Sequence, residues 1–153
     1  MLSRRRYDMV ATNSTAMETE RIDLRRLWWA SLLAGVGAAV ANTLIYLIAS
    51  AAGAMPQSVL VPGINQPIGP MPVILNSFVP AILAAVFLAL LNRFTRRPVR
   101  IFRIVAVVVL VVSFVNPFTI PGAPLAMILV LDLMHVIAAA IIVGVLTTLP
   151  VKR

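Results

Sequence analysis

The chain has 153 residues, of which 61% are hydrophobic and 12% are charged. Thirteen Lys and Arg residues against 5 Asp and Glu residues give a formal net charge of +8, which in a soluble domain would indicate a nucleic-acid partner. A mean hydropathy of +1.00 leaves too little polar surface for a soluble globule, so we expect a membrane protein that contacts the lipid bilayer and no nucleic acid. The lack of cysteine excludes disulfides, thiolate nucleophiles and Cys-ligated metal centres.

Four apolar runs are long enough to cross a bilayer core of about 30 Å as helices. We expect them at residues 27–52, 73–91, 101–118 and 125–149, which predicts an all-α integral membrane four-helix bundle. The third run is unbroken only over residues 104–112, and Arg103 must snorkel to the headgroups, so a re-entrant hairpin is the alternative there. The membrane domain, residues 27–149, thus lies between a basic and polar N-terminal segment, residues 1–26, and a short tail, residues 150–153.

The positive charges separate completely by segment. They lie before the first span, between the second and third, and after the fourth, whereas residues 53–72 and 117–124 carry no charge. By the positive-inside rule, both termini and the middle turn face the cytoplasm of a plasma (inner) membrane. The five arginines of that turn, which topology alone explains, are also candidates for binding anionic lipid headgroups: Arg93, Arg96, Arg97, Arg100 and Arg103.

The N-terminal segment predicts no cleavable signal, because a polar run follows its first basic residues. Thr15 and Glu18 have the spacing of a capping box. Together with the apolar Met17, Ile22 and Leu24, they predict a short interfacial helix that runs into the first span.

Prolines are dense between the first two spans, over residues 53–72, at positions 56, 62, 67, 70 and 72. They forbid a helix and predict a compact extended loop on the extracytoplasmic side. Its apolar residues indicate that it packs down on the bundle. Two interpretations stay open: a rigid connector, and a lid over a ligand.

Small residues recur every four positions in the first two spans. The stripes predict that the two helices meet as antiparallel neighbours, since small residues let membrane helices approach closely. Other small-residue faces offer contacts for a protein partner or a second copy of the chain. The two stripes are Ala30, Ala34, Ala38 and Asn42 in the first span, and Ser77, Ala81, Ala85 and Ala89 in the second.

Polar side chains inside the spans gather in the outer half of the predicted bundle. Asp132 and His135 are three residues apart and so share a helix face on which they can hydrogen-bond. An intramembrane carboxylate is costly, which makes Asp132 a candidate functional residue. The cluster is open to two interpretations, a hydrogen-bonded group that fixes helix register and a ligand-binding or proton-handling site. Its members are Asp132, His135, Asn42, Asn76, Ser77, Ser113 and Asn116.

Specific chemistries find little support in the sequence. One His and one Asp per chain fall short of the ligands that zinc or iron needs unless an oligomer pools them, and there is no phosphate-binding glycine loop, so we predict no metal and no cofactor. A Ser113 nucleophile with His135 as base and Asp132 as orienter is conceivable, but no motif or oxyanion hole supports it. We therefore assign no catalytic residue and favour a non-enzymatic protein.

Three stretches carry a resemblance that spreads over most of the chain: AGVGAAVANTLIYLIA in the first span, the Arg-rich turn after the second, and LDLMHVIAA in the fourth. With them the chain resembles small uncharacterised bacterial membrane proteins of about four helices, catalogued as a domain of unknown function. The resemblance implies a fold and a membrane location, and no activity.

These observations favour an accessory subunit of a larger assembly or a small binding module of unknown ligand. The alternative is a small oligomeric proton-coupled transporter or channel, in which Asp132 titrates and His135 relays the proton. An enzyme that acts on lipid or isoprenoid headgroups is the third hypothesis.

Overall fold

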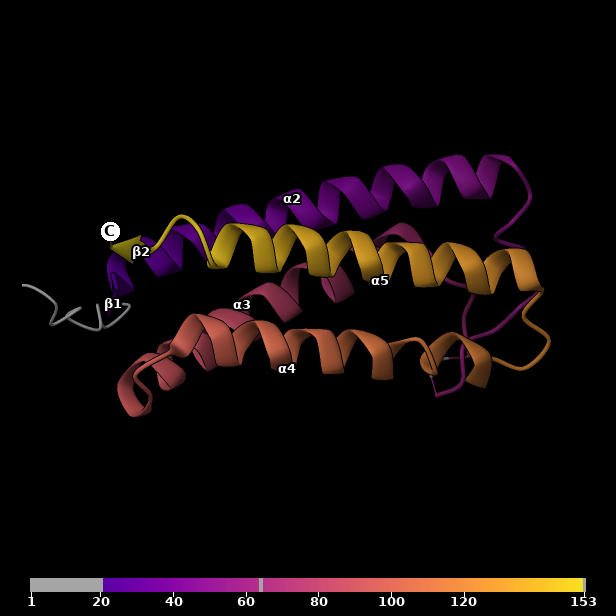
Figure 1. Cartoon of the computed structure of the whole chain (residues 1–153). Coiled ribbons are helices and arrows are strands. Elements are labelled where there is room, and N and C mark those ends of the chain that lie inside the picture. Colours follow the sequence, from indigo (N-terminus) through magenta and orange to yellow (C-terminus); the bar gives the residue numbers. More distant parts are fainter. Residues whose placement is uncertain (1–20, 64, 153) are drawn as a thin grey trace, which may run out of the picture.

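The computed structural model describes residues 21–63 and 65–152. Its four long helices run alternately up and down and form an elongated bundle (Figure 1): α2 (Leu24–Ala51), α3 (Pro70–Phe94), α4 (Pro98–Ser113) and α5 (Leu125–Leu146). With the 3-10 turn η2 (Asn116–Thr119), α4 forms a segment of 22 residues, so all four are long and apolar enough to cross a membrane. The all-α four-helix prediction is confirmed, and the third apolar run forms a membrane-length helical segment.

Three helices begin earlier than the apolar runs suggest: α2 at Leu24, α3 at Pro70 and α4 at Pro98. Asp23 caps α2, because its Oδ1 accepts hydrogen bonds from the backbone N–H groups of Arg25 at 3.0 Å and Arg26 at 3.3 Å. The helix α3 begins inside the proline-rich segment, at Pro70. The expectation that this whole segment is non-helical is wrong at its end, since the first turn of a helix needs no N–H and tolerates Pro70 and Pro72.

A small antiparallel strand pair joins the two described ends of the chain. In it, β1 (Arg21–Ile22) pairs with β2 (Val151–Lys152), and Ile22 lies opposite Val151. The backbone N–H of Ile22 also donates to Asn92 Oδ1 at the end of α3, over 3.2 Å. The predicted interfacial helix is therefore wrong at Ile22, which lies in a strand; its proposed capping box lies outside the described residues. Both described ends and the Arg-rich turn lie at one end of the bundle, the basic end (Figure 1).

The interior of the bundle is built from small residues. The helix α2 makes its most extensive contacts with α3 and α5. The predicted meeting of the two small-residue stripes is confirmed, because their central alanines are almost fully buried: Ala30, Ala34 and Ala38 on α2, and Ala81 and Ala85 on α3. A Cβ at Gly35 would lie 2.6 Å from Phe78 Cδ2, so a larger residue there would force the Phe78 ring or the helices to move.

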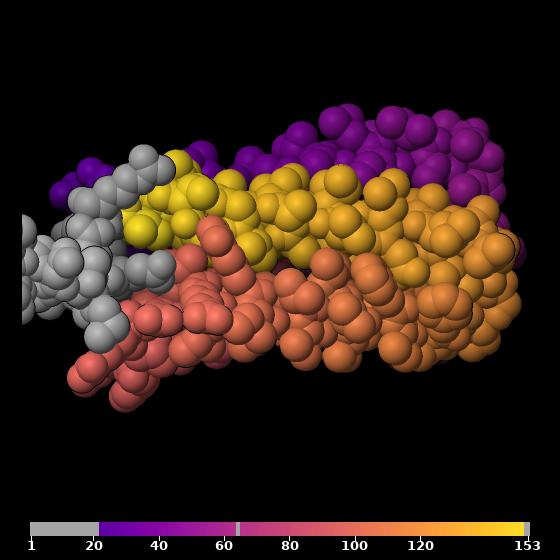
Figure 2. All heavy atoms as spheres, viewed as in Figure 1, coloured from indigo at the N-terminus to yellow at the C-terminus, as the bar shows by residue number. Residues whose placement is uncertain are grey.

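The helix α4 is anchored only near its start. Its buried residues are Pro98, Val99 and Phe102, all at the basic end. The Phe102 ring lies 6.3 Å from the ring of Phe87 on α3, and Arg103 Nη2 donates to Thr147 Oγ1 at 2.9 Å. Figure 2 shows α4 and α5 side by side along one face of the molecule. Beyond Phe102, no residue of α4 is buried, so this part of the helix does not pack into the core.

The proline-rich segment covers the opposite end of the bundle, the loop end. Its side chains Met55 and Val59 are buried there with Met127 of α5. The hydroxyl of Tyr46 on α2 donates to the carbonyl of Ile68 at 3.0 Å. The segment is thus fixed to the helices by both apolar packing and a hydrogen bond.

Candidate functional site: a cavity inside the bundle

A cavity of about 780 Å³ lies between α3, α4 and α5, and α2 reaches it through Asn42. Its size falls in the range of small-molecule sites, roughly 300–1,000 Å³. The cavity exists because α4 is buried only as far as Phe102. Beyond that residue the inward face of α4 lines the cavity instead of packing on the core, through Val105, Ala106, Val109, Leu110 and Ser113.

The cavity is open at its side. Leu83 on α3 and Val109 on α4 both line it, and yet they are 63% and 60% exposed. Side chains that line a cavity and are also widely exposed lie at its mouth. The opening therefore lies between α3 and α4, on the surface that lipid chains would cover.

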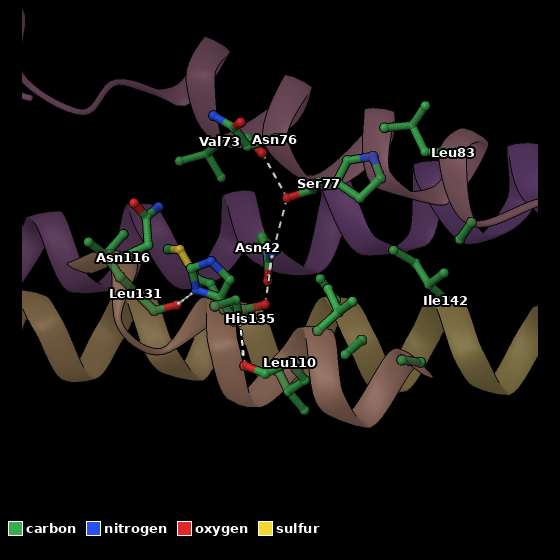
Figure 3. A pocket seen from close by; sticks show the side chains of 18 of the residues that line it. Asn42, Val73, Asn76, Ser77, Leu83, Leu110, Asn116, Leu131, His135 and Ile142 are labelled. Carbon is green, nitrogen blue, oxygen red and sulfur yellow. Dashed lines mark hydrogen bonds between the residues drawn. The ribbon is translucent and has the colours of Figure 1, made fainter. Parts of the chain in front are cut away.

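Polar and apolar lining residues lie at different ends of the cavity. Figure 3 shows Asn76, Asn116 and His135 toward one end, and Leu83 and Ile142 toward the other. The polar end is the one nearer the proline-rich segment, whose Val61 and Ile68 also line the cavity. Six of the seven polar residues singled out from the sequence line this one cavity: Asn42, Asn76, Ser77, Ser113, Asn116 and His135.

Asn42 connects three helices at the polar end. Its Nδ2 donates to Ser77 Oγ on α3 at 2.9 Å and to the carbonyl of Met134 on α5 at 3.2 Å. Ser77 in turn donates to the carbonyl of Val73 at 2.7 Å. The Oδ1 of Asn42 is buried and accepts no hydrogen bond from the described residues. The amide thus uses both its donor hydrogens in holding helices together and keeps an acceptor unused.

His135 has a tautomer that its neighbour determines. Its Nδ1 lies 2.7 Å from the carbonyl oxygen of Leu131, which can only accept, so Nδ1 carries the hydrogen. In the tautomer that carries its hydrogen on Nδ1, Nε2 is a hydrogen-bond acceptor. Because His135 lines the cavity, this places a second acceptor at its polar end (Figure 3).

A third acceptor comes from the backbone of α3. Pro80 lies inside this helix and has no N–H, so the carbonyl of Asn76, four residues earlier, lacks its helical partner. Both residues line the cavity. This acceptor was not predicted from the sequence, although a proline in the middle of the apolar run 73–91 is a signal for a freed carbonyl.

Asp132 is not among the residues that line the cavity. The expected hydrogen bond between Asp132 and His135 is not formed among the described residues, because the His135 ring bonds Leu131 instead. The Oδ1 of Asp132 is buried and accepts no hydrogen bond from the part of the chain described here. The structure therefore separates the acidic residue from the other members of the predicted cluster.

The five arginines of the middle turn all lie at the basic end, and all are exposed. Arg103 is engaged with Thr147, and the Arg93 guanidinium lies 6.0 Å from the centroid of the Phe94 ring. Arg25 and Arg26 lie at the same end, where with Trp29 they line a second hollow of about 550 Å³. The candidate headgroup-binding residues are thus gathered far from the polar end of the cavity.

The chain belongs to a family of unknown function, DUF6069, whose model matches residues 22–149 and so includes all four helices. No curated protein and no solved structure matches it. No relative therefore supplies a ligand or an activity, and the functional argument starts from the cavity.

Proposed function

We propose that this member of the DUF6069 family is a non-enzymatic binding module that holds a lipid-like ligand inside the membrane, in the cavity between α3, α4 and α5. The observation that carries this proposal is a cavity of about 780 Å³ with polar side chains at one end only. Ligand sites are mostly apolar, with a few polar groups that fix orientation. A side opening between α3 and α4 would admit such a ligand directly from the bilayer.

The test is to fill the cavity and measure lipid retention. Ala139 lines the cavity, whereas its neighbour Ala140 is exposed and does not. Ala139→Phe places a ring in the cavity, and Ala140→Phe places the same ring on the lipid-facing surface. Native mass spectrometry of each protein, extracted from membranes in mild detergent, reports the bound lipid. We expect wild type and Ala140→Phe to retain a lipid-sized adduct and Ala139→Phe to lose it.

Equal adducts on all three proteins would contradict the proposal, because annular lipid does not depend on the cavity. The same spectra also test the accessory-subunit form of the hypothesis. A module that works within a larger assembly would carry a second protein of constant mass and stoichiometry.

A binding role is better supported than a channel. Apolar clusters lie at both ends of the bundle: Leu27, Leu88, Phe102 and Leu146 belong to the one at the basic end, and Tyr46, Met55 and Met127 to the one at the loop end. A proton path needs polar groups or water through such regions. The clusters favour a chamber closed at both ends and open at its side.

The orientation is part of the proposal: the basic end faces the cytoplasm of a plasma membrane, and the proline-rich segment faces outward. The grouping of Arg25, Arg26 and the middle-turn arginines at one end supports it. There these arginines would contact anionic headgroups. A fluorescent reporter that matures only in the cytoplasm should be active after Arg153 and inactive after Gly63. A periplasmic phosphatase at the same positions should give the opposite result, and the reverse pattern would overturn the orientation.

A further inference from the structure

We infer that the ligand is an uncharged amphiphile whose head group donates a hydrogen bond, that is, a hydroxyl-bearing lipid such as a long-chain alcohol. The inference rests on the proposed binding function and names the class of ligand for that same cavity. Three properties of the lining carry it: its charge, its hydrogen-bond donors and acceptors, and the shape of its apolar end.

The first property is charge. Among the described residues that line the cavity, none is Lys, Arg, Asp or Glu. A carboxylate or phosphate held there would have no cation to compensate the loss of its hydration, which is expensive in a low-dielectric site. The head group bound at the polar end is therefore neutral.

The second property is that the innermost polar groups have already used their donors. Ser77 donates to Val73 at 2.7 Å, and Ser113 donates to Leu110 at 2.7 Å. The Nδ2 of Asn42 and the Nδ1 of His135 donate to protein oxygens as well. The side-chain amides of Asn76 and Asn116 still have donors, and both of these residues are exposed.

Acceptors, in contrast, remain available at the polar end. They are the Nε2 of His135 and the backbone carbonyl of Asn76, which receives no N–H from Pro80; the Oδ1 of Asn42 is fully buried and out of reach of a ligand. An acceptor with no donor is costly in an apolar environment, and a ligand that brings a donor removes this cost. A hydroxyl meets the requirement, whereas an ether or ester oxygen at the same place would add a further acceptor.

The third property is the long apolar part of the cavity. Figure 3 shows Leu83 and Ile142 away from the polar end. Phe87 and Phe102, whose ring centroids lie 6.3 Å apart, also line the cavity, and Phe102 lies in the first turns of α4 at the basic end. This part accommodates an extended hydrocarbon chain, with its end near the two aromatic rings. The ligand is then oriented with its head group toward the proline-rich segment and its chain toward the basic end.

The experiment compares three probes that share a sixteen-carbon chain: 1-hexadecanol, its methyl ether, and palmitate. Delipidated full-length protein in detergent is titrated with each, and occupancy is read by native mass spectrometry. Ala139→Phe serves to subtract binding outside the cavity. We expect the alcohol to bind about tenfold more tightly than the ether, a difference of about 1.4 kcal/mol. Palmitate, measured at a pH where it is ionised, should bind more weakly than the alcohol by at least as much.

Two variants test the acceptors separately. His135→Phe removes Nε2 while it keeps an aromatic ring, and it should reduce the preference for alcohol over ether to about threefold or less. Pro80→Ala supplies the missing N–H to the Asn76 carbonyl and improves the helix, so it folds even if His135→Phe does not. It should lower the same preference.

The outcomes distinguish a failure of the proposed binding function from a failure of the inference about the head group. If no probe binds, or if Ala139→Phe binds all three as wild type does, the proposed function itself fails. If the ether or palmitate binds as tightly as the alcohol in the cavity, the binding function stands and the inference about the head group is overturned. An alcohol preference that survives in both His135→Phe and Pro80→Ala would likewise overturn it.

Discussion

Asn42 on α2 donates a hydrogen bond of 2.9 Å to Ser77 on α3, in a seam whose central residues are mostly alanines. The same amide donates to the carbonyl of Met134 on α5 at 3.2 Å, so one side chain joins three helices. Between membrane helices, small residues supply close contact and polar side chains supply hydrogen bonds. The contact of α2 with α3 around Asn42 combines buried alanines with a hydrogen bond between polar side chains.

Asn42→Ala should therefore destabilise the fold, because it removes two interhelical hydrogen bonds. Such bonds average about 0.6 kcal/mol each in membrane proteins, so we expect a loss of about 1–2 kcal/mol once the lost packing is included. Reversible unfolding in mixed micelles measures it. The adjacent Thr43→Val is the control, since the Thr43 Oγ1 is buried and has no hydrogen-bond partner among the described residues. An Asn42→Ala protein as stable as Thr43→Val would show that the bonds contribute nothing.

Gly35→Ala should destabilise the α2–α3 seam. The new Cβ would lie 2.6 Å from Phe78 Cδ2, which forces the ring or the helices to move, at a cost of about 1–3 kcal/mol. Gly37→Ala is the matched control, because its Cβ would meet only Ile141 Cγ2 at 3.5 Å, an ordinary contact. Adding Phe78→Leu to Gly35→Ala should recover much of the lost stability. A failure of that rescue, measured by thermal unfolding, would place the strain elsewhere.

The parts of the fold that the sequence predicts are those fixed by length and periodicity. Apolar runs of membrane length predict the four helices, and the four-residue repeat around Ala34 and Ala81 predicts which two of them pack most closely. The helix starts were less accurate, because the Asp23 cap and the tolerance of a first turn for Pro70 act on single residues outside the apolar runs.

The cavity could not be predicted in the same way. It depends on α4 packing only as far as Phe102 and then standing away, which no local pattern in a valine-rich helix encodes. Depth along the helices placed Asn42 and His135 at one level correctly. It also placed Asp132 there, but depth does not say which direction a side chain faces around the helix, and Asp132 is not among the cavity-lining residues.

The pairing of the chain ends offers a test that needs no ligand. Ile22 and Val151 lie opposite each other in the β1–β2 pair, at a separation typical of cross-strand disulfides. The chain has no cysteine, so Ile22→Cys combined with Val151→Cys gives a clean background. Mild oxidation in membranes should form an intramolecular disulfide, seen as a faster band on a non-reducing gel. Ile22→Cys with Ala52→Cys, at opposite ends of α2, should not crosslink within one chain. A monomeric double variant that stays reduced would contradict the pairing.

Asp132→Asn distinguishes the binding module from the proton-coupled transporter. Asp132 is outside the cavity lining, and its buried Oδ1 accepts no hydrogen bond from the described residues. Asn keeps the shape of the side chain, and its replacement of Asp132 breaks no hydrogen bond at the buried Oδ1. We therefore expect unchanged hexadecanol binding and a stability equal to or above that of wild type. Ala139→Phe in parallel should lose binding.

The transporter hypothesis predicts the opposite dependence for Asp132. Wild type in liposomes would then carry a pH-dependent flux that Asp132→Asn abolishes, without change in folding or in lipid retention. Under the binding hypothesis, wild-type and Asp132→Asn liposomes collapse an imposed pH gradient at the same rate as empty vesicles. The two measurements together distinguish the hypotheses, because the binding hypothesis predicts no change in flux or in ligand binding, and the transporter hypothesis predicts a loss of flux alone.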